Sequence, residues 1–215
     1  MRTAAVLLLL LPAAQAEAQE SLETKLVITQ EGRETGREEF TLRQGRGRGA
    51  PGSTLIAVAR YPATNPLLKL AATLERTPES ALAKFQLDVE GPNGTTVILA
   101  AGSGARLIVR TVAKGSEAGR ELPGGPDVVL LDEGVYSLYA AVVDLATSGG
   151  KALTGVFPRT SRRASFVARR EAGSGGTARV TLSGDINGTV VADAKGRMQQ
   201  LEFPGSRITV TRAPD

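Results

Sequence analysis

The sequence predicts a mainly β protein: a curved antiparallel sheet, or an incompletely closed β-barrel in two halves, with one central amphipathic α-helix packed on or inside it. Short runs of alternating apolar and polar residues recur along the 215-residue chain, separated by turns rich in Gly, Pro and Asn. The stretch 127–150 alone changes from strand-like to helical spacing. Many strands with regular turns and one helix are typical of curved sheets and barrels.

Residues 1–18 have the pattern of a signal peptide. Arg2 supplies a positive start, residues 4–11 form an apolar core too short to span a bilayer, and Ala14 and Ala16 give a small-residue cleavage site. No cysteine follows for lipid attachment, and no other stretch is apolar enough to form a transmembrane segment. We therefore expect a soluble mature protein that is exported and is periplasmic or extracellular.

Residues 19–126 are expected to form an N-terminal β meander. A hairpin is predicted within 22–43, around a charged turn that contains Gly32 and Gly36. The RG-rich stretch 43–52 is interpreted as an exposed loop, with a basic nucleic-acid arm as the alternative. The Gly/Glu/Arg-rich segment 114–126 is also predicted to be a loop. The strands expected between these two loops are 53–61, 68–77, 81–90, 95–101 and 105–112.

Residues 127–150 are predicted to form a strand followed by the central helix. The apolar run 127–131 suits a buried strand, and the Asp132 side chain can cap the amides of a following helix at 133–146. Ser137 and Asp144 fall on the polar side of this helix, and residues 147–150 (TSGG) are expected to end it. The residues expected on its broad apolar face are Val135, Leu138, Tyr139, Val142, Leu145 and Ala146.

Residues 151–215 are expected to form a C-terminal β meander, and 19–215 one globular unit. Short Gly- and Asn-containing turns punctuate this part as they do the first half. The predicted strands are 151–157, 163–170, 178–183, 188–193, 198–203 and 207–211.

The composition excludes several chemistries. Without histidine or cysteine the chain cannot form a Ser-His-Asp or Cys-His nucleophile, a zinc site of the His/Cys kind or a CxxC redox motif. Removal of residues 1–16 leaves 25 basic and 22 acidic residues, a net charge too small to argue for nucleic acid, and tryptophan is absent. We predict no catalytic set, no metal and no cofactor.

Three weak motifs remain: two leave a hydrolase open as an alternative, and one suggests an oxygen-ligand metal site. Ser148 and Lys151 satisfy S-x-x-K, but they lie where the helix should end and the companion motifs of serine lactamases are missing. Asp132 and Glu133 could be half of a carboxylate pair, although acids are typical of a helix start. The segment 185–188 (DING) resembles the opening of a calcium loop, but a hairpin turn is the simpler interpretation.

Five arginines cluster around one predicted strand pair. They could form an anion-binding patch for lipid head groups or acidic polymer. The alternative is a sheet edge protected by charge against aggregation. These residues are Arg159, Arg162, Arg163, Arg169 and Arg170.

Short motifs in the second half resemble those of known proteins. They are 128–139 (VVLLDEGVYSLY), 156–158 (VFP), 193–197 (DAKGR), 201–204 (LEFP) and 210–212 (VTR). On these residues the chain resembles an uncharacterised group of exported bacterial β-rich proteins. More loosely, it is similar to periplasmic unclosed-β-barrel proteins of the lipoprotein-carrier kind. This resemblance implies a hydrophobic cavity between sheet and helix that could hold an acyl chain.

The leading hypothesis is a non-enzymatic periplasmic protein that binds a lipid-like or apolar ligand or a cell-envelope partner. The alternatives are a hydrolase using carboxylate or Ser-Lys chemistry and a structural accessory module of an envelope complex. The candidate ligand-binding residues are Val135, Leu138, Tyr139 and Val142, whose side chains are either the floor of a binding site or plain core.

Overall fold

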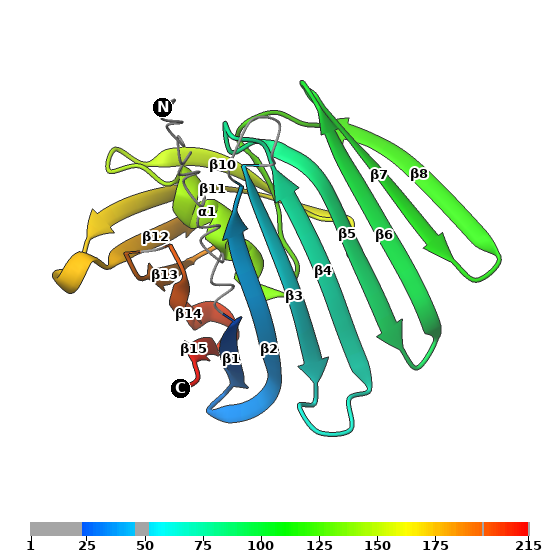
Figure 1. The fold of residues 1–215 in the computed structure, drawn as a ribbon, viewed down its shortest axis with the longest axis horizontal. Helices are drawn as coiled ribbons and strands as arrows, with labels where there is room; N and C mark the ends of the chain where they lie inside the picture. Colours follow the sequence, from blue (N-terminus) through cyan, green and yellow to red (C-terminus); the bar gives the residue numbers. More distant parts are fainter. Residues whose placement is uncertain (1–22, 46–51, 195, 215) are drawn as a thin grey trace, which may run out of the picture.

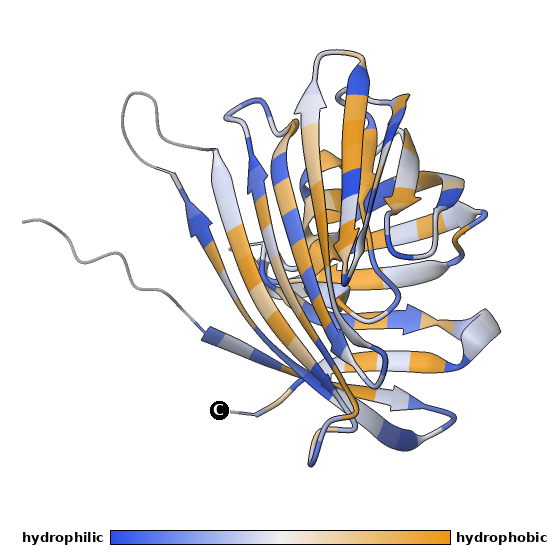
Figure 2. Cartoon of the chain, turned by 90° about the vertical axis from the view of Figure 1, so that its right-hand side faces the viewer, coloured by the Kyte–Doolittle hydropathy of each residue, from blue (hydrophilic) through white to orange (hydrophobic). Residues whose placement is uncertain are grey.

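A single sheet forms almost all of the regular structure in the computed structural model, which describes residues 23–45, 52–194 and 196–214. The predicted signal peptide and most of the RG-rich loop lie outside these residues. Along the strands, apolar and polar side chains alternate, which gives the banded colouring of Figure 2. The apolar set faces the helix and the polar set faces solvent, as expected for antiparallel strands with one buried face.

The first eight strands form a continuous meander that confirms the predicted β character of this half. They are β1 (Glu23–Gln30), β2 (Arg33–Gln44), β3 (Ser53–Tyr61), β4 (Leu68–Arg76), β5 (Leu82–Gly91), β6 (Gly94–Ser103), β7 (Arg106–Ala113) and β8 (Ser116–Pro123).

The remaining elements begin with a short strand and the helix. They are β9 (Val128–Leu130), η1 (Tyr136–Tyr139), α1 (Ala140–Leu145), β10 (Lys151–Phe157), β11 (Arg162–Ala172), η2 (Ser174–Gly176), β12 (Ala178–Gly184), β13 (Gly188–Ala192), β14 (Met198–Phe203), η3 (Pro204–Ser206) and β15 (Ile208–Arg212).

The strands lie in the order β8-β7-β6-β5-β4-β3-β2-β1-β15-β14-β13-β12-β11-β10-β9, so the sheet is not closed. Every neighbouring pair is antiparallel except β9 and β10, which run parallel with Val129 opposite Gly155. In the middle, β1 pairs with β15, and Ile28 lies opposite Val210. The sheet curves around α1, which lies between an N-terminal arm, β1–β8, and a C-terminal arm, β9–β15 (Figure 1).

The helix is a 3-10 turn, η1, continued directly by α1, and it is buried on nearly all sides. Val135, Leu138 and Val142 have no exposed surface, as expected for the apolar face. The expected polar face differs: Ser137 is fully buried, and Asp144 is the only exposed residue among 135–146 besides the half-buried Leu145. A helix enclosed by two arms of a sheet has no wide solvent-facing side. Helical spacing alone therefore predicted a polar face that the structure does not have.

Three local features differ from the sequence prediction. Residues 116–123, predicted as part of a loop, form the edge strand β8, which pairs with β7 after a turn at Gly115. The helix ends at Leu145 because Ala146 takes an extended conformation, so the glycines at 149 and 150 lie beyond its end. Gly36, predicted in the hairpin turn, lies inside β2, where an added Cβ would clash with the Tyr61 ring.

An ion pair between sheet and helix anchors α1. Arg76 of β4 has a side chain that is 6 % exposed, and its Nη1 lies 2.8 Å from Oδ2 of Asp144. The guanidinium also donates from Nε and Nη2 to the backbone oxygen of Ser80. The polar residue on the exposed side of α1 is therefore a partner of a buried charge.

We expect Asp144→Ser to lower the free energy of unfolding by about 2 kcal/mol, because it leaves a buried guanidinium without its carboxylate. The matched control is Asp127→Ser, which removes an exposed carboxylate paired with Lys151 at 2.6 Å. That change should cost less than about 1 kcal/mol. Urea denaturation followed by circular dichroism measures both, and equal values would contradict the anchoring role of Asp144.

Candidate functional site

The start of the helix is held by a buried carboxylate from the sheet. Glu38 of β2 has no exposed surface. Its Oε2 accepts a hydrogen bond from the Tyr136 amide at 2.8 Å, and its Oε1 accepts one from the Ser137 amide at 3.0 Å. The first amides of a helix have no partner within it and carry partial positive charge, so a carboxylate satisfies both needs.

The environment of Glu38 changes its acidity. Burial raises the pKa of this carboxyl from 4.5 to about 7; hydrogen bonds from Ser137 and Tyr136 oppose the rise, and the nearby charge of Asp132 adds to it. The sequence contained a signal for this residue, since Glu38 alternates in phase with the apolar Phe40 and Leu42. A charged side chain in an otherwise apolar strand face requires a buried partner.

A second buried carboxylate fixes the loop that leads into the helix. Asp132, 1 % exposed, accepts from Arg159 through two bonds, Nε to Oδ2 and Nη2 to Oδ1, each 2.8 Å. Its Oδ1 also accepts from the Gly134 amide at 2.8 Å. The prediction that Asp132 caps the helix amides is therefore wrong in its partner, because Glu38 takes that role and Asp132 closes the preceding turn.

Tyr61 of β3 completes the support of this loop. Its hydroxyl donates to the Gly134 carbonyl at 2.8 Å. Burial raises the pKa of this phenol, so it stays protonated and remains a donor. Side chains from β2, β3 and the β10–β11 turn thus hold residues 132–137.

Beside this loop lies a cavity of about 460 Å³ with an aromatic floor. The Phe203 ring centroid is 5.3 Å from that of Tyr139 and 6.3 Å from that of Tyr136. Four of the eight aromatic residues of the chain gather here, because η1 faces the turns at one end of the C-terminal strands. The lining residues are Asp132, Glu133, Tyr136, Tyr139, Phe157, Arg162, Asp185, Ile186, Asn187, Phe203, Gly205, Ser206 and Ile208.

The polar groups of this aromatic cavity are of two kinds. Burial raises the pKa of Tyr136 and of Tyr139, so both phenols stay neutral. In the described part of the chain neither hydroxyl makes a hydrogen bond, which leaves both available to a ligand. At the rim, Arg162 pairs with Glu133 at 3.1 Å and covers the Phe157 ring, its guanidinium carbon 3.7 Å from the centroid.

The structure places the four candidate ligand-binding residues in two different environments. Tyr139 lines the aromatic cavity. Val135, Leu138 and Val142 have no exposed surface, belong to the core cluster and do not line this cavity. Phe157 and Phe203 also line this cavity. Both lie in the short motifs 156–158 and 201–204, but nothing in the sequence indicated that these distant strand ends meet at the helix.

The arginine cluster is not gathered into one place. Arg159 is bound to Asp132, and Arg162 to Glu133. Arg170 donates from Nη1 to the Val143 carbonyl at 3.4 Å, near the helix end. Arg163 and Arg169 are outward, exposed residues of β11. The predicted anion patch thus separates into two ion pairs, one helix contact and two solvated side chains.

Residues of the weak motifs form ion pairs and hydrogen bonds within the fold. Lys151 pairs with Asp127 at 2.6 Å. Asp185 accepts from the Ser165 amide at 2.8 Å, and Asn187 donates to the Gly184 carbonyl at 2.7 Å, which makes 185–188 a hairpin turn. Among the described residues no group of three or more acidic side chains is placed to hold a metal ion, and no helix is long and apolar enough to cross a bilayer.

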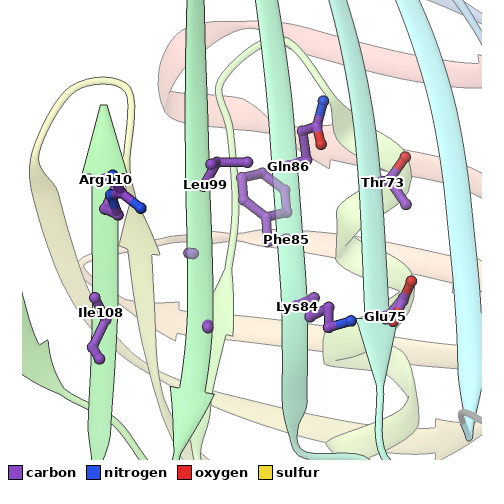
Figure 3. Close-up of a pocket in the computed structure, with 10 residues that line it drawn as sticks. Thr73, Glu75, Lys84, Phe85, Gln86, Leu99, Ile108 and Arg110 are labelled. Atoms are coloured by element: carbon purple, nitrogen blue, oxygen red, sulfur yellow. The ribbon is translucent and has the colours of Figure 1, made fainter. Parts of the chain in front are cut away.

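A further hollow of about 450 Å³ lies on the outer face of the sheet. Figure 3 shows its side chains on neighbouring strands from β4 to β7. Oppositely charged residues such as Glu75 and Lys84 lie opposite each other across β4 and β5. The hollow is lined mainly by the solvent-facing set of the alternation, which indicates a curved, solvated sheet surface, so the aromatic cavity is the stronger candidate site.

Comparisons with known proteins support the fold and do not indicate a function. No protein-family model matches the sequence, and no curated protein matches it. A crystal structure of a DUF1089 family protein from Pseudomonas aeruginosa is similar, with a TM-score of 0.53 and 14% sequence identity over 80% of this chain and 90% of that chain. At this identity the similarity shows a shared β-rich fold alone.

Glu38 should make the stability of the protein depend on pH. Its raised pKa means that the folded protein keeps a proton that the unfolded chain, near its ordinary value of 4.5, has lost. The contribution is therefore complete below pH 4.5 and is lost as the pH rises to about 7. We expect the free energy of unfolding of the native protein to fall by about 3 kcal/mol across this window relative to Glu38→Gln.

Urea denaturation at a series of pH values tests this expectation. The control is Glu39→Gln, which changes the neighbouring outward carboxylate that accepts from Arg60 at 3.2 Å. It should keep the native pH profile, whereas Glu38→Gln should flatten it. Identical profiles for all three proteins would show that Glu38 does not titrate in this window.

Proposed function

We propose that this protein binds a small amphipathic or lipid-like molecule in the aromatic cavity. The observation that carries the proposal is the convergence of Tyr136, Tyr139, Phe157 and Phe203 around one space of about 460 Å³. Small-molecule sites commonly have volumes of about 300–1,000 Å³, with a mainly apolar lining and a few placed polar groups.

The lining supports a ligand with an apolar part and a neutral or zwitterionic polar part. Tyr136 and Tyr139 line the cavity, and their hydroxyls make no hydrogen bond with a described residue, which suits a ligand with hydroxyl or carbonyl oxygens. The rim carries both signs of charge, from Glu133, Asp185 and Arg162, so it does not favour a ligand of strong net charge. An alkyl or ring group against the aromatic floor would provide most of the binding free energy.

Export belongs to the same proposal. The signal-peptide pattern of residues 1–18 supports a mature protein that acts in the periplasm or outside the cell. A lipid-like ligand would fit such a compartment, and an envelope protein remains the other partner class that the sequence suggests.

The neutral fluorescent probe N-phenylnaphthylamine tests the cavity. We expect saturable enhancement of its fluorescence by the native protein, and its loss in Ser206→Trp, because a large side chain at this exposed rim position would fill the cavity without replacing a core residue. Ser148→Trp, at an exposed turn position outside the cavity, is the matched control and should bind the probe normally.

Two results would contradict the proposal. One is no saturable binding by the native protein. The other is equal binding by Ser206→Trp and Ser148→Trp, which would place the probe elsewhere. Extraction of the protein purified from its native host, followed by mass spectrometry, would then identify what, if anything, it carries.

A further inference from the structure

A second cavity, of about 440 Å³, lies on the inner side of the N-terminal arm, between β5–β8 and the β10–β11 turn. Apolar residues of β5, β6 and β8 form part of its wall, and the turn residues 158–161 lie opposite. Its lining residues are Val89, Thr96, Ile98, Thr111, Ala118, Gly119, Arg120, Pro158, Arg159 and Ser161.

Arg120 gives this cavity its charge. It lies on β8 opposite Val109 of β7, whose side chain is buried in the core, so its guanidinium is on the inner face of the sheet. Nη2 donates to the Pro158 carbonyl at 3.0 Å. Within the described residues Arg120 makes no ion pair, so a half-buried positive charge is compensated by a neutral carbonyl alone.

The other polar side chains in the cavity fit the same kind of ligand. Arg159 uses Nε and Nη2 for Asp132, and its Nη1 makes no hydrogen bond with a described residue. The hydroxyls of Thr96, Thr111 and Ser161 can donate. No acidic side chain lines the cavity, in contrast to the aromatic cavity, whose lining includes three.

We propose that this second cavity binds a single-chain anionic amphiphile, a carboxylate or phosphate head group on a short alkyl chain. The head group would accept from Arg120, whose planar guanidinium suits the oxygens of either anion, and the chain would lie along Val89, Ile98 and Ala118. The complementarity between an unpaired cation in an acid-free cavity and an anionic head group carries this inference. It does not depend on the function proposed for the aromatic cavity.

An inward-pointing charge on an edge strand has a competing explanation. β8 is at the end of the sheet, and such charges prevent edge-to-edge association. That role would need a positive charge at residue 120 but no ligand and no particular geometry. The two explanations therefore differ in what Arg120 substitutions do to binding and to aggregation.

Calorimetric titration with octyl phosphate, octanoate, octanol and inorganic phosphate tests the proposal. We expect octyl phosphate or octanoate, or both, to bind saturably below their micelle-forming concentrations, octanol much more weakly, and inorganic phosphate weakly because it lacks the chain. The ratio between the two charged amphiphiles tells which head group the site prefers. Binding of the charged amphiphiles should weaken with added salt.

Arg120→Gln should weaken binding of the preferred amphiphile by about ten- to a hundredfold. Arg179→Gln removes the same charge from an exposed position of β12 and should leave binding unchanged. Ser206→Trp should also leave it unchanged, which separates this site from the aromatic cavity. Arg120→Lys, which keeps the charge but loses the planar fork, should be intermediate and remains informative if Arg120→Gln fails to fold.

The proposal would be overturned if neither charged amphiphile bound saturably, or if octanol bound as tightly as the preferred charged amphiphile. Native affinity in Arg120→Gln or Arg120→Lys would overturn it as well. If Arg120→Gln aggregates while Arg120→Lys keeps native solubility and native affinity, edge protection is the role of this arginine.

Discussion

The hydrogen bonds between the Glu38 carboxylate and the amides of Tyr136 and Ser137 are the contact on which the interior depends. A helix of this length is not stable alone in water and has to be held by its surroundings. Glu38 lies on β2, next to the centre of the sheet, so one buried side chain fixes where the helix starts relative to both arms. The aromatic cavity exists because η1 is held there.

The two ends of the helix are held by complementary charges. The acidic Glu38 meets the amides at the start, and the guanidinium of Arg170 meets the Val143 carbonyl near the end. This arrangement follows the polarity of the helix dipole. Arg76 and Asp144 add a partly buried pair on the side of α1. Buried charges of this kind define a position more than they add stability, since desolvation offsets much of their attraction.

Sequence reasoning recovered most strands because alternation is local. β3, β10 and β14 begin and end where the spacing predicted. β8 was missed because an edge strand with few buried side chains has no apolar alternation to recognise. The helix was located, but its surroundings were not. Ser137 and Asp144 were expected on a solvent-facing side, whereas Ser137 is buried and Asp144 pairs with Arg76 of the sheet.

The sites were less accessible to sequence reasoning, and the reason is again distance along the chain. Tyr139 could be named from helical spacing, whereas Phe203 reaches the same cavity from the end of β14. Arg120 lay in a segment assigned to a loop, and the direction of its side chain depends on the strand that the sequence did not reveal. Glu38 was not predicted either, although its place in phase with Phe40 and Leu42 is visible in the strand pattern.

The order of strands gives the sheet a simple description. Each neighbouring pair is consecutive along the chain except one, β1 with β15. The two ends of the sheet, β8 and β9, are joined by residues 124–127, whereas its middle is formed by the first and last of the described strands. From β10 to β8 the fold is therefore a circular permutation of a plain meander, to which β9 adds one parallel edge strand through the helical connection. Opening the chain at residues 124–127 and joining β15 to β1 would leave every strand beside its neighbour in sequence, and the pair that now needs the longest loop closure would become an ordinary hairpin.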